Sequence, residues 1–192
     1  THHPASDLSP AWAPDGRNVA FISLRGGESD VWLANLDLAG DERYQNLSNT
    51  PLETESSPVW SRDGSRLMWA TGAQTVGFSG LYVWDTAHPT RAAQWVGNGS
   101  LGVWNGSVDQ VVAVIGAPNQ YFLSSYNFNG DILLAPMPLS GRVRGMHWGV
   151  AELPNPLPSP LAQAGGAAPP SLLGARLAPL PVFPPRGERY PP

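Results

Sequence analysis

Short apolar runs alternate with turn-forming sequence over most of this chain of 192 residues. Within the runs, apolar and polar residues often alternate, which is typical of strands that bury one face. Gly, Pro, Asn and Asp separate the runs, as expected for tight turns. The predicted strands are Trp12 with 19–23, 30–35 and 45–47, then 59–61, 67–70, 80–85 and 92–96, and finally 101–104, 111–115, 121–126 and 132–135. This pattern predicts an all-β fold.

One sequence unit occurs twice in register. Residues 9–22 recur as residues 57–70, and the tryptophans Trp12 and Trp60 are 48 residues apart. Each copy reads as a β-hairpin in which a short strand carries the Trp, Asp-Gly forms the turn, and an apolar strand follows. Self-similarity at such a spacing indicates a repeat architecture.

The repeated wording, Ser9-Pro10-Ala11-Trp12-Ala13-Pro14-Asp15-Gly16 in the first copy, resembles the TolB-type β-propeller repeat. The second copy departs from the family pattern at Arg62, where Pro is usual. The resemblance implies four-stranded blades, at about 9–50, 57–98 and 101–142 within residues 1–150. The third blade is degenerate, because Asn105-Gly106 follows Trp104 directly.

Three blades do not close a ring, since closed propellers typically have about four to eight. The sequence leaves three alternatives open: a piece of a longer propeller, a ring completed by another chain, and an open arc. A fourth blade start is hidden in residues 144–148, because Trp148 lies 44 residues beyond Trp104.

The final segment, residues 151–192, is rich in Pro, Ala and Leu. Proline lacks a backbone donor, so this segment is predicted to be an extended linker or docking tail rather than part of a sheet. Its candidate partner contacts are Leu177 and Phe183.

The residues that recur in each repeat are predicted to have structural roles rather than catalytic ones. Trp12, Trp60 and Trp104 fall at one place in each repeat and are predicted to be buried between blades. Asp15-Gly16 and Asp63-Gly64 are predicted to form turns in which the carboxylate bonds nearby backbone amides. Trp84 and Trp95 lie off the repeated position and are candidate partner contacts.

Charge and composition narrow the classes of partner. The formal net charge is −4, with −7 on residues 1–141 and +3 on residues 142–192. An acidic body argues against nucleic-acid binding, which needs a clustered positive face. No apolar run approaches the roughly 20 residues that span a membrane, and the absence of cysteine excludes disulfides and thiolate metal sites.

No catalytic or cofactor motif is predicted. Residues 97–102 match the pattern G-x-G-x-x-G, but the residues that follow do not begin a helix, so we interpret this stretch as a loop between blades. No nucleophile elbow and no metal-ligand spacing of histidines is found. The sequence therefore predicts neither enzyme activity nor a cofactor or metal.

Two functions remain. The first is a non-catalytic module that binds protein, or a scaffolding element of the cell envelope or of a larger assembly, including a homo- or hetero-oligomer. The second is the non-catalytic propeller of a larger hydrolase, such as a peptidase or cell-wall enzyme, whose catalytic domain lies outside this chain. The resemblance to TolB-type proteins implies an extracytoplasmic location.

Overall fold

The computed structural model describes residues 1–50, 53–73, 79–106 and 109–149. These residues form three four-stranded antiparallel sheets, each with its strands in chain order. The all-β fold and the blade-like strand order expected from the sequence are confirmed. The Pro-rich segment lies outside the described residues.

The first sheet contains β1 (Asp7–Trp12), β2 (Asn18–Ser23), β3 (Asp30–Asn35) and β4 (Tyr44–Asn46). A single 3₁₀ turn, η1 (Gly40–Arg43), precedes the short outer strand. The sequence pattern predicted the four strands but not this turn.

The second sheet contains β5 (Glu53–Trp60), β6 (Arg66–Ala73), β7 (Ser79–Asp85) and β8 (Gln94–Asn98). Strand β5 is longer than predicted, because its polar first half pairs with the end of β6. Pairing with a neighbouring strand supplies backbone hydrogen bonds whatever the polarity of the side chains.

The third sheet contains β9 (Leu101–Trp104), β10 (Gln110–Ala117), β11 (Gln120–Asn127) and β12 (Ile132–Leu139). The motif is weakest here, yet β10 and β11 pair without a break over eight residues each. The degenerate sequence therefore still forms a complete blade.

The first strands of the first two sheets share a bulge. The register of β1 shifts between Leu8 and Ala11, and that of β5 shifts between Ser56 and Val59. The serines of the two Ser-Pro pairs, Ser9 and Ser57, have positive φ values of 49° and 53°. Strand β9 has no such shift. The Ser-Pro pair of the repeat thus marks a β-bulge, which bends the strand and redirects its side chains.

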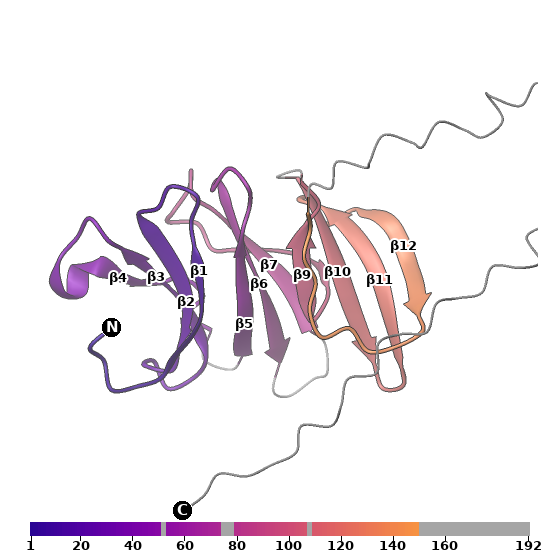
Figure 1. The fold of residues 1–192 in the computed structure, drawn as a ribbon, viewed down its shortest axis with the longest axis horizontal. Helices are drawn as coiled ribbons and strands as arrows, with labels where there is room; N and C mark the ends of the chain where they lie inside the picture. The colour runs from indigo at the N-terminus through magenta and orange to yellow at the C-terminus, as the bar shows by residue number, and fades with distance from the viewer. Residues whose placement is uncertain (51–52, 74–78, 107–108, 150–192) are drawn as a thin grey trace, which may run out of the picture. The chain divides into compact units, whose positions relative to one another are not determined.

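The three sheets follow one another in chain order (Figure 1). One apolar core lies between the first and second sheets, and another between the second and third. Strand β6 contributes to both, because successive side chains of a strand point to opposite faces. Leu67 and Trp69 pack toward the first sheet, whereas Met68 and Ala70 pack toward the third. The second blade is therefore buried on both faces.

The chain after β12 returns to the first strand of its own blade. Residues 141–149 run from the end of β12 back beside β9 (Figure 1). They contain no strand, so the repeat does not continue as a fourth blade within the described residues.

Candidate functional site at the inner strands

The repeated tryptophans connect each blade to the one before it. The indole nitrogen of Trp60 donates to the carbonyl oxygen of Ala11 at 3.0 Å, and that of Trp104 donates to the carbonyl of Val59 at 3.1 Å. Ala11 and Val59 each directly precede the motif tryptophan of their own blade. The two hydrogen bonds are therefore equivalent and form a ladder along the repeat.

The burial of each motif tryptophan depends on whether a blade precedes its own. Trp104 is 6% exposed in the core between the second and third blades, and Trp60 packs against the core between the first and second. Trp12, by contrast, is 62% exposed, which corrects the expectation that all three are buried. Each indole packs on the preceding blade, and no blade precedes the first among the described residues.

The two Asp-Gly turns form as the sequence predicts. Oδ1 of Asp15 accepts hydrogen bonds from the backbone amides of Arg17 and Asn18, and Gly16 has a φ of 68°. Burial would raise the pKa of Asp15, but these hydrogen bonds outweigh it and hold the pKa below its usual value.

In the second turn Asp63 Oδ1 accepts from Ser61, Ser65 and the Ser65 amide, and Gly64 has a φ of 74°. The pKa of Asp63 is lowered for the same reason, with burial again opposing. Both carboxylates are occupied by local backbone and side-chain donors, so their role is to fix the turns.

A groove of about 630 Å³ crosses the first strands of all three blades. It is lined by Ser9 and Pro10 of β1, residues 57–60 of β5, and residues 101–104 of β9. The two bulged Ser-Pro pairs therefore open onto the same groove. A groove that crosses β1, β5 and β9, the first strands of the three blades, has the shape to bind an extended ligand along its length.

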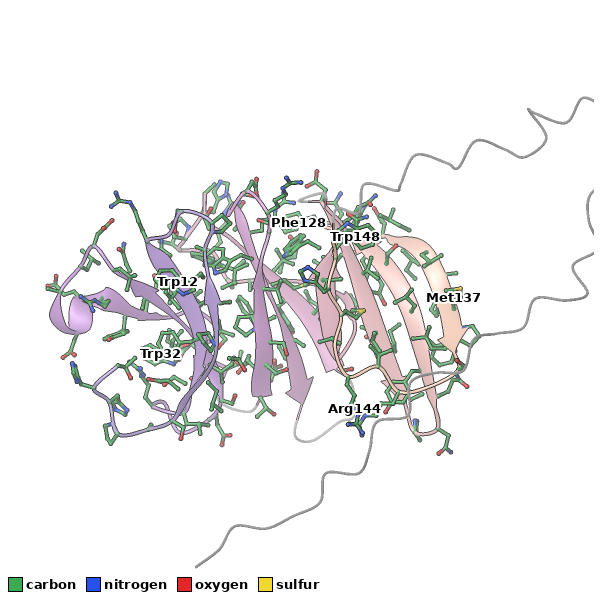
Figure 2. The ribbon with its side chains drawn as sticks, in the orientation of Figure 1. Trp12, Trp32, Phe128, Met137, Arg144 and Trp148 are labelled. Carbon is green, nitrogen blue, oxygen red and sulfur yellow. The ribbon has the colours of Figure 1, made fainter. Side chains whose placement is uncertain are left out.

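The segment after β12 forms one wall of this groove. Residues 145–148 line it, together with Arg62. Trp148, labelled in Figure 2, lies beside Gly106: a Cβ there would be 3.2 Å from the Trp148 indole nitrogen. The 44-residue spacing from Trp104 was the sequence signal for Trp148, whereas nothing in the sequence indicated that Arg62 would lie in the groove.

The other predicted contacts differ in exposure. Trp84 is 5% exposed in the core between the first two blades, which corrects its assignment as a partner contact. It lies on the face of β7 that turns toward the first blade. Trp95 on β8 is 49% exposed and stays a candidate contact. Leu177 and Phe183 lie outside the described residues.

The glycine pattern at residues 97–102 has a packing role. It lies on β8, a short turn and β9 rather than before a helix. A Cβ on Gly97 would be 2.6 Å from the ring of Tyr126, and one on Gly102 would be 2.9 Å from Met68. These glycines let the second and third blades approach closely.

Titratable side chains around the groove are few. His147 is the histidine in its lining. His88 lies in a turn, where its ring nitrogen is 3.0 Å from Asp85 and lowers the pKa of that carboxyl. The described residues contain no group of three or more His, Cys, Asp or Glu side chains placed to hold a metal ion.

Sequence comparison relates the chain to two kinds of protein. It is 33% identical over 61 residues to the Tol-Pal system protein TolB of Alcanivorax borkumensis, which is 31% of this chain and 13% of that protein. It is 35% identical over 68 residues to the uncharacterized peptidase YuxL of Bacillus subtilis, which is 35% of this chain and 10% of that protein. The chain thus spans only a small part of either relative, and no family model matches it.

Structural comparison leads to the same fold. TolB from Acinetobacter baumannii superposes with a TM-score of 0.58 at 18% identity, over 73% of this chain and 34% of that one. The superposition agrees with the repeat sequence and with the four-stranded sheets. The three blades therefore have the fold of TolB-type β-propellers.

Proposed function

We propose that this chain is a non-catalytic propeller segment that binds protein, acting as a scaffolding element of the cell envelope or of a larger assembly. The observation that carries the proposal is the exposed Trp12. In the next two blades the same residue donates a hydrogen bond across a blade interface. In the first blade this group is free to do the same toward a partner.

The surface around Trp12 has the chemistry of an interface. Leu8 on the same strand is 53% exposed. A cavity of about 360 Å³ on the outward face of the first blade is lined by Val19, Phe21 and Tyr44, among others. An exposed apolar patch of this kind commonly marks a protein interaction site. Its position in the repeat favours a further propeller blade, on this or another polypeptide, as the partner.

A photo-crosslinking experiment tests the proposal. Benzoylphenylalanine replaces Trp12 in the protein as it is made in its native host, and mass spectrometry identifies the peptides that become linked on irradiation. We expect links to a strand of a neighbouring blade or partner subunit, close to the residue that precedes its motif tryptophan.

The matched control carries the same crosslinker at Glu42, an exposed residue of η1. Crosslinks from position 12 that are no more frequent or specific than those from position 42 would contradict the proposal.

A second candidate function is the non-catalytic propeller of a larger hydrolase. The similarity to peptidase YuxL over 68 residues favours it. The intact mass of the native protein, together with its tryptic peptides, separates the two, because a hydrolase would carry a catalytic domain on the same polypeptide. The extracytoplasmic location belongs to the proposal too, and cell fractionation tests it. No helix among the described residues has the length and apolar character needed to cross a membrane.

A further inference from the structure

Arg25 occupies an aromatic cage on the first blade. Its guanidinium carbon lies 4.8 Å from the ring centroids of both Trp32 and Tyr44, and 5.3 Å from that of Phe21. Trp32, one of these three rings, is labelled in Figure 2. The side chain is 8% exposed, and a guanidinium nitrogen lies 3.1 Å from the Asp7 carboxylate. The first blade thus holds a buried cation between a carboxylate and aromatic rings.

The Arg25 Nε also donates to the hydroxyl of Ser23 at 2.8 Å. Five residues therefore surround this cation: Asp7, Phe21, Ser23, Trp32 and Tyr44. Because the blades repeat, strand register identifies the residue of the second blade that corresponds to each.

Two of the equivalents come from one pair of strands. Asp7 pairs with Ser23 in the first blade as Glu55 pairs with Thr71 in the second. Each pair lies at the same distance from its motif tryptophan. The second blade therefore repeats the carboxylate and the hydroxyl of the cage.

The aromatic positions follow in the same way. Phe21 pairs with Trp32 as Trp69 pairs with Tyr82, so two rings are retained. The position of Tyr44, however, corresponds to Ala93 when the register of β8 is continued by one residue. The second blade has lost the third ring of the cage.

The cation itself is missing from the second blade. The residue 48 positions after Arg25 is Ala73. A cavity of about 180 Å³ lies here, larger than the roughly 30 Å³ that one water occupies in the liquid. All five equivalent residues line it, namely Glu55, Trp69, Thr71, Tyr82 and Ala93.

Each of the two carboxylates that face this cavity has one oxygen without a hydrogen-bond donor among the described residues. Glu55 is 3% exposed, and its Oε2 accepts no hydrogen bond from the described residues. Oε2 of Glu53, which lines the same cavity, is also buried without one. A buried carboxylate oxygen without a donor is costly, so each points to a group that is yet to bind.

The protonation of the two equivalent carboxyls differs accordingly. Burial and the charges of Asp30 and Glu53 raise the pKa of Glu55 to about 7, although a hydrogen bond from Thr50 opposes them. Burial also acts on Asp7, but hydrogen bonds from Ser23, Thr1 and Arg25 outweigh it and lower the pKa.

We propose that the cavity between the first and second blades binds an alkylguanidinium ion, held by the carboxylates of Glu55 and Glu53 against the rings of Trp69 and Tyr82. The bound group takes the place that the Arg25 side chain fills in the first blade. The ion is either a small molecule or an arginine side chain of a polypeptide, since both present the same group. This site is independent of the partner proposed for Trp12.

Isothermal titration of the intact chain with methylguanidinium tests the site. N-methylurea, which has a similar shape and no charge, is the control ligand. We expect methylguanidinium to bind and to shift the indole N–H resonance of Trp69, and N-methylurea to do neither. Equal binding of both compounds, or no binding of methylguanidinium, would overturn the proposal.

Two variants locate the binding. Glu55→Gln keeps the shape of the side chain, and we expect it to weaken methylguanidinium binding about tenfold or more. Ala93→Tyr restores the third ring of the cage that holds Arg25 in the first blade, so we expect it to strengthen methylguanidinium binding about two- to fivefold. Glu42→Gln, at an exposed position, should bind as the parent chain does. Unchanged affinity in folded Glu55→Gln and Ala93→Tyr chains would contradict the assignment.

A peptide identifies the source of the group. Acetyl-Gly-Arg-Gly-amide binding more tightly than methylguanidinium indicates an arginine of a polypeptide, whereas weaker binding indicates a small molecule. Either result supports a guanidinium site, provided that acetyl-Gly-Gln-Gly-amide fails to bind. Equal binding of the Gln peptide would count against it.

Discussion

The two blade interfaces use the same hydrogen bond but different side chains around it. Between the first and second blades, two carboxylates are buried. Asp30 accepts a hydrogen bond from Asn46, and Glu55 lines the cavity of about 180 Å³. Between the second and third blades, buried Met68, Leu81 and Tyr126 pack against one another without a buried charge among the described residues. One interface is polar and incompletely filled, and the other is apolar and closely packed.

A few positions account for this difference. The strand pair that carries Trp69 and Tyr82 in the second blade carries Ala113 and Ser124 in the third. Small residues there let the third blade approach more closely, and Gly97 and Gly102 meet large side chains across the gap. A propeller repeat can therefore keep its backbone pattern while individual interfaces become either tight joints or ligand sites.

The largest effect is expected from Trp104→Ala at the apolar interface. The substitution removes a buried ring and the hydrogen bond to Val59, and we expect it to lower the free energy of unfolding by about 3–5 kcal/mol. Denaturant unfolding followed by circular dichroism measures the change. Trp104→Phe should lose much less, because most of the ring remains. A loss under about 1 kcal/mol for Trp104→Ala would show that the third blade is not held by this residue.

The polar interface should respond to pH. Glu55 ionises near its ordinary pKa of 4.5 when unfolded and near 7 when folded. Between these values the unfolded chain loses the proton first, so the free energy of unfolding falls as the pH rises from about 4.5 to 7, by at most roughly 3 kcal/mol. Above this range both states are ionised and the effect is constant.

Unfolding measured from pH 4.5 to 8 tests this prediction, with Glu55→Gln as the comparison, because Gln does not titrate. Asp15 and Asp63 have lowered pKa values, so their contributions are lost at more acidic pH, outside this range. The same slope in the parent and Glu55→Gln chains would mean that another group is responsible.

The third largest loss of stability is expected from a methyl group added at the closely packed interface between the second and third blades. The Cβ of Gly97→Ala would lie 2.6 Å from the Tyr126 ring, so we expect a loss of about 1–3 kcal/mol in the free energy of unfolding. Gly72→Ala on β6 is the matched control, since a Cβ there has no described neighbour within 4 Å. Equal stability of the two variants would show that the blades can separate slightly at no cost.

The smallest change in the free energy of unfolding is expected on the face of the first blade that no other blade covers among the described residues. Trp12 is 62% exposed, so Trp12→Ala should change the free energy of unfolding of the isolated chain by less than about 0.5 kcal/mol. Thermal unfolding alongside Trp60→Ala measures the contrast, because Trp60 has the same role in a filled interface. A large loss on Trp12→Ala would mean that the first blade already has a covering segment.

Strand positions could be predicted from the sequence because local signals specify them. Alternating apolar residues and the turns at Asp15-Gly16 and Asp63-Gly64 place the hairpins of the first two blades. The extension of β5 back to Glu53 has a weaker signal, since only Thr54 among residues 53–56 favours strands, and pairing with β6 decides the conformation.

The burial of individual side chains could not be predicted in the same way. Trp12 and Trp60 have the same sequence context, yet only Trp60 has a blade to pack on. The cavity at Glu55 had a partial signal, because Ala73 stands 48 residues after Arg25. The loss of the third ring at Ala93 lies outside that spacing and becomes visible only through the register of β8.

The outermost strand of the third blade bears on solubility. Strand β12 exposes Ile132, Leu133 and Met137, and such a strand readily recruits identical strands into intermolecular sheets. Pro136 and Pro138 lie within this strand, and neither has a backbone N–H to donate to an incoming strand. We therefore expect Pro136 and Pro138, which are exposed and form no part of the core, to oppose aggregation through this edge of the sheet.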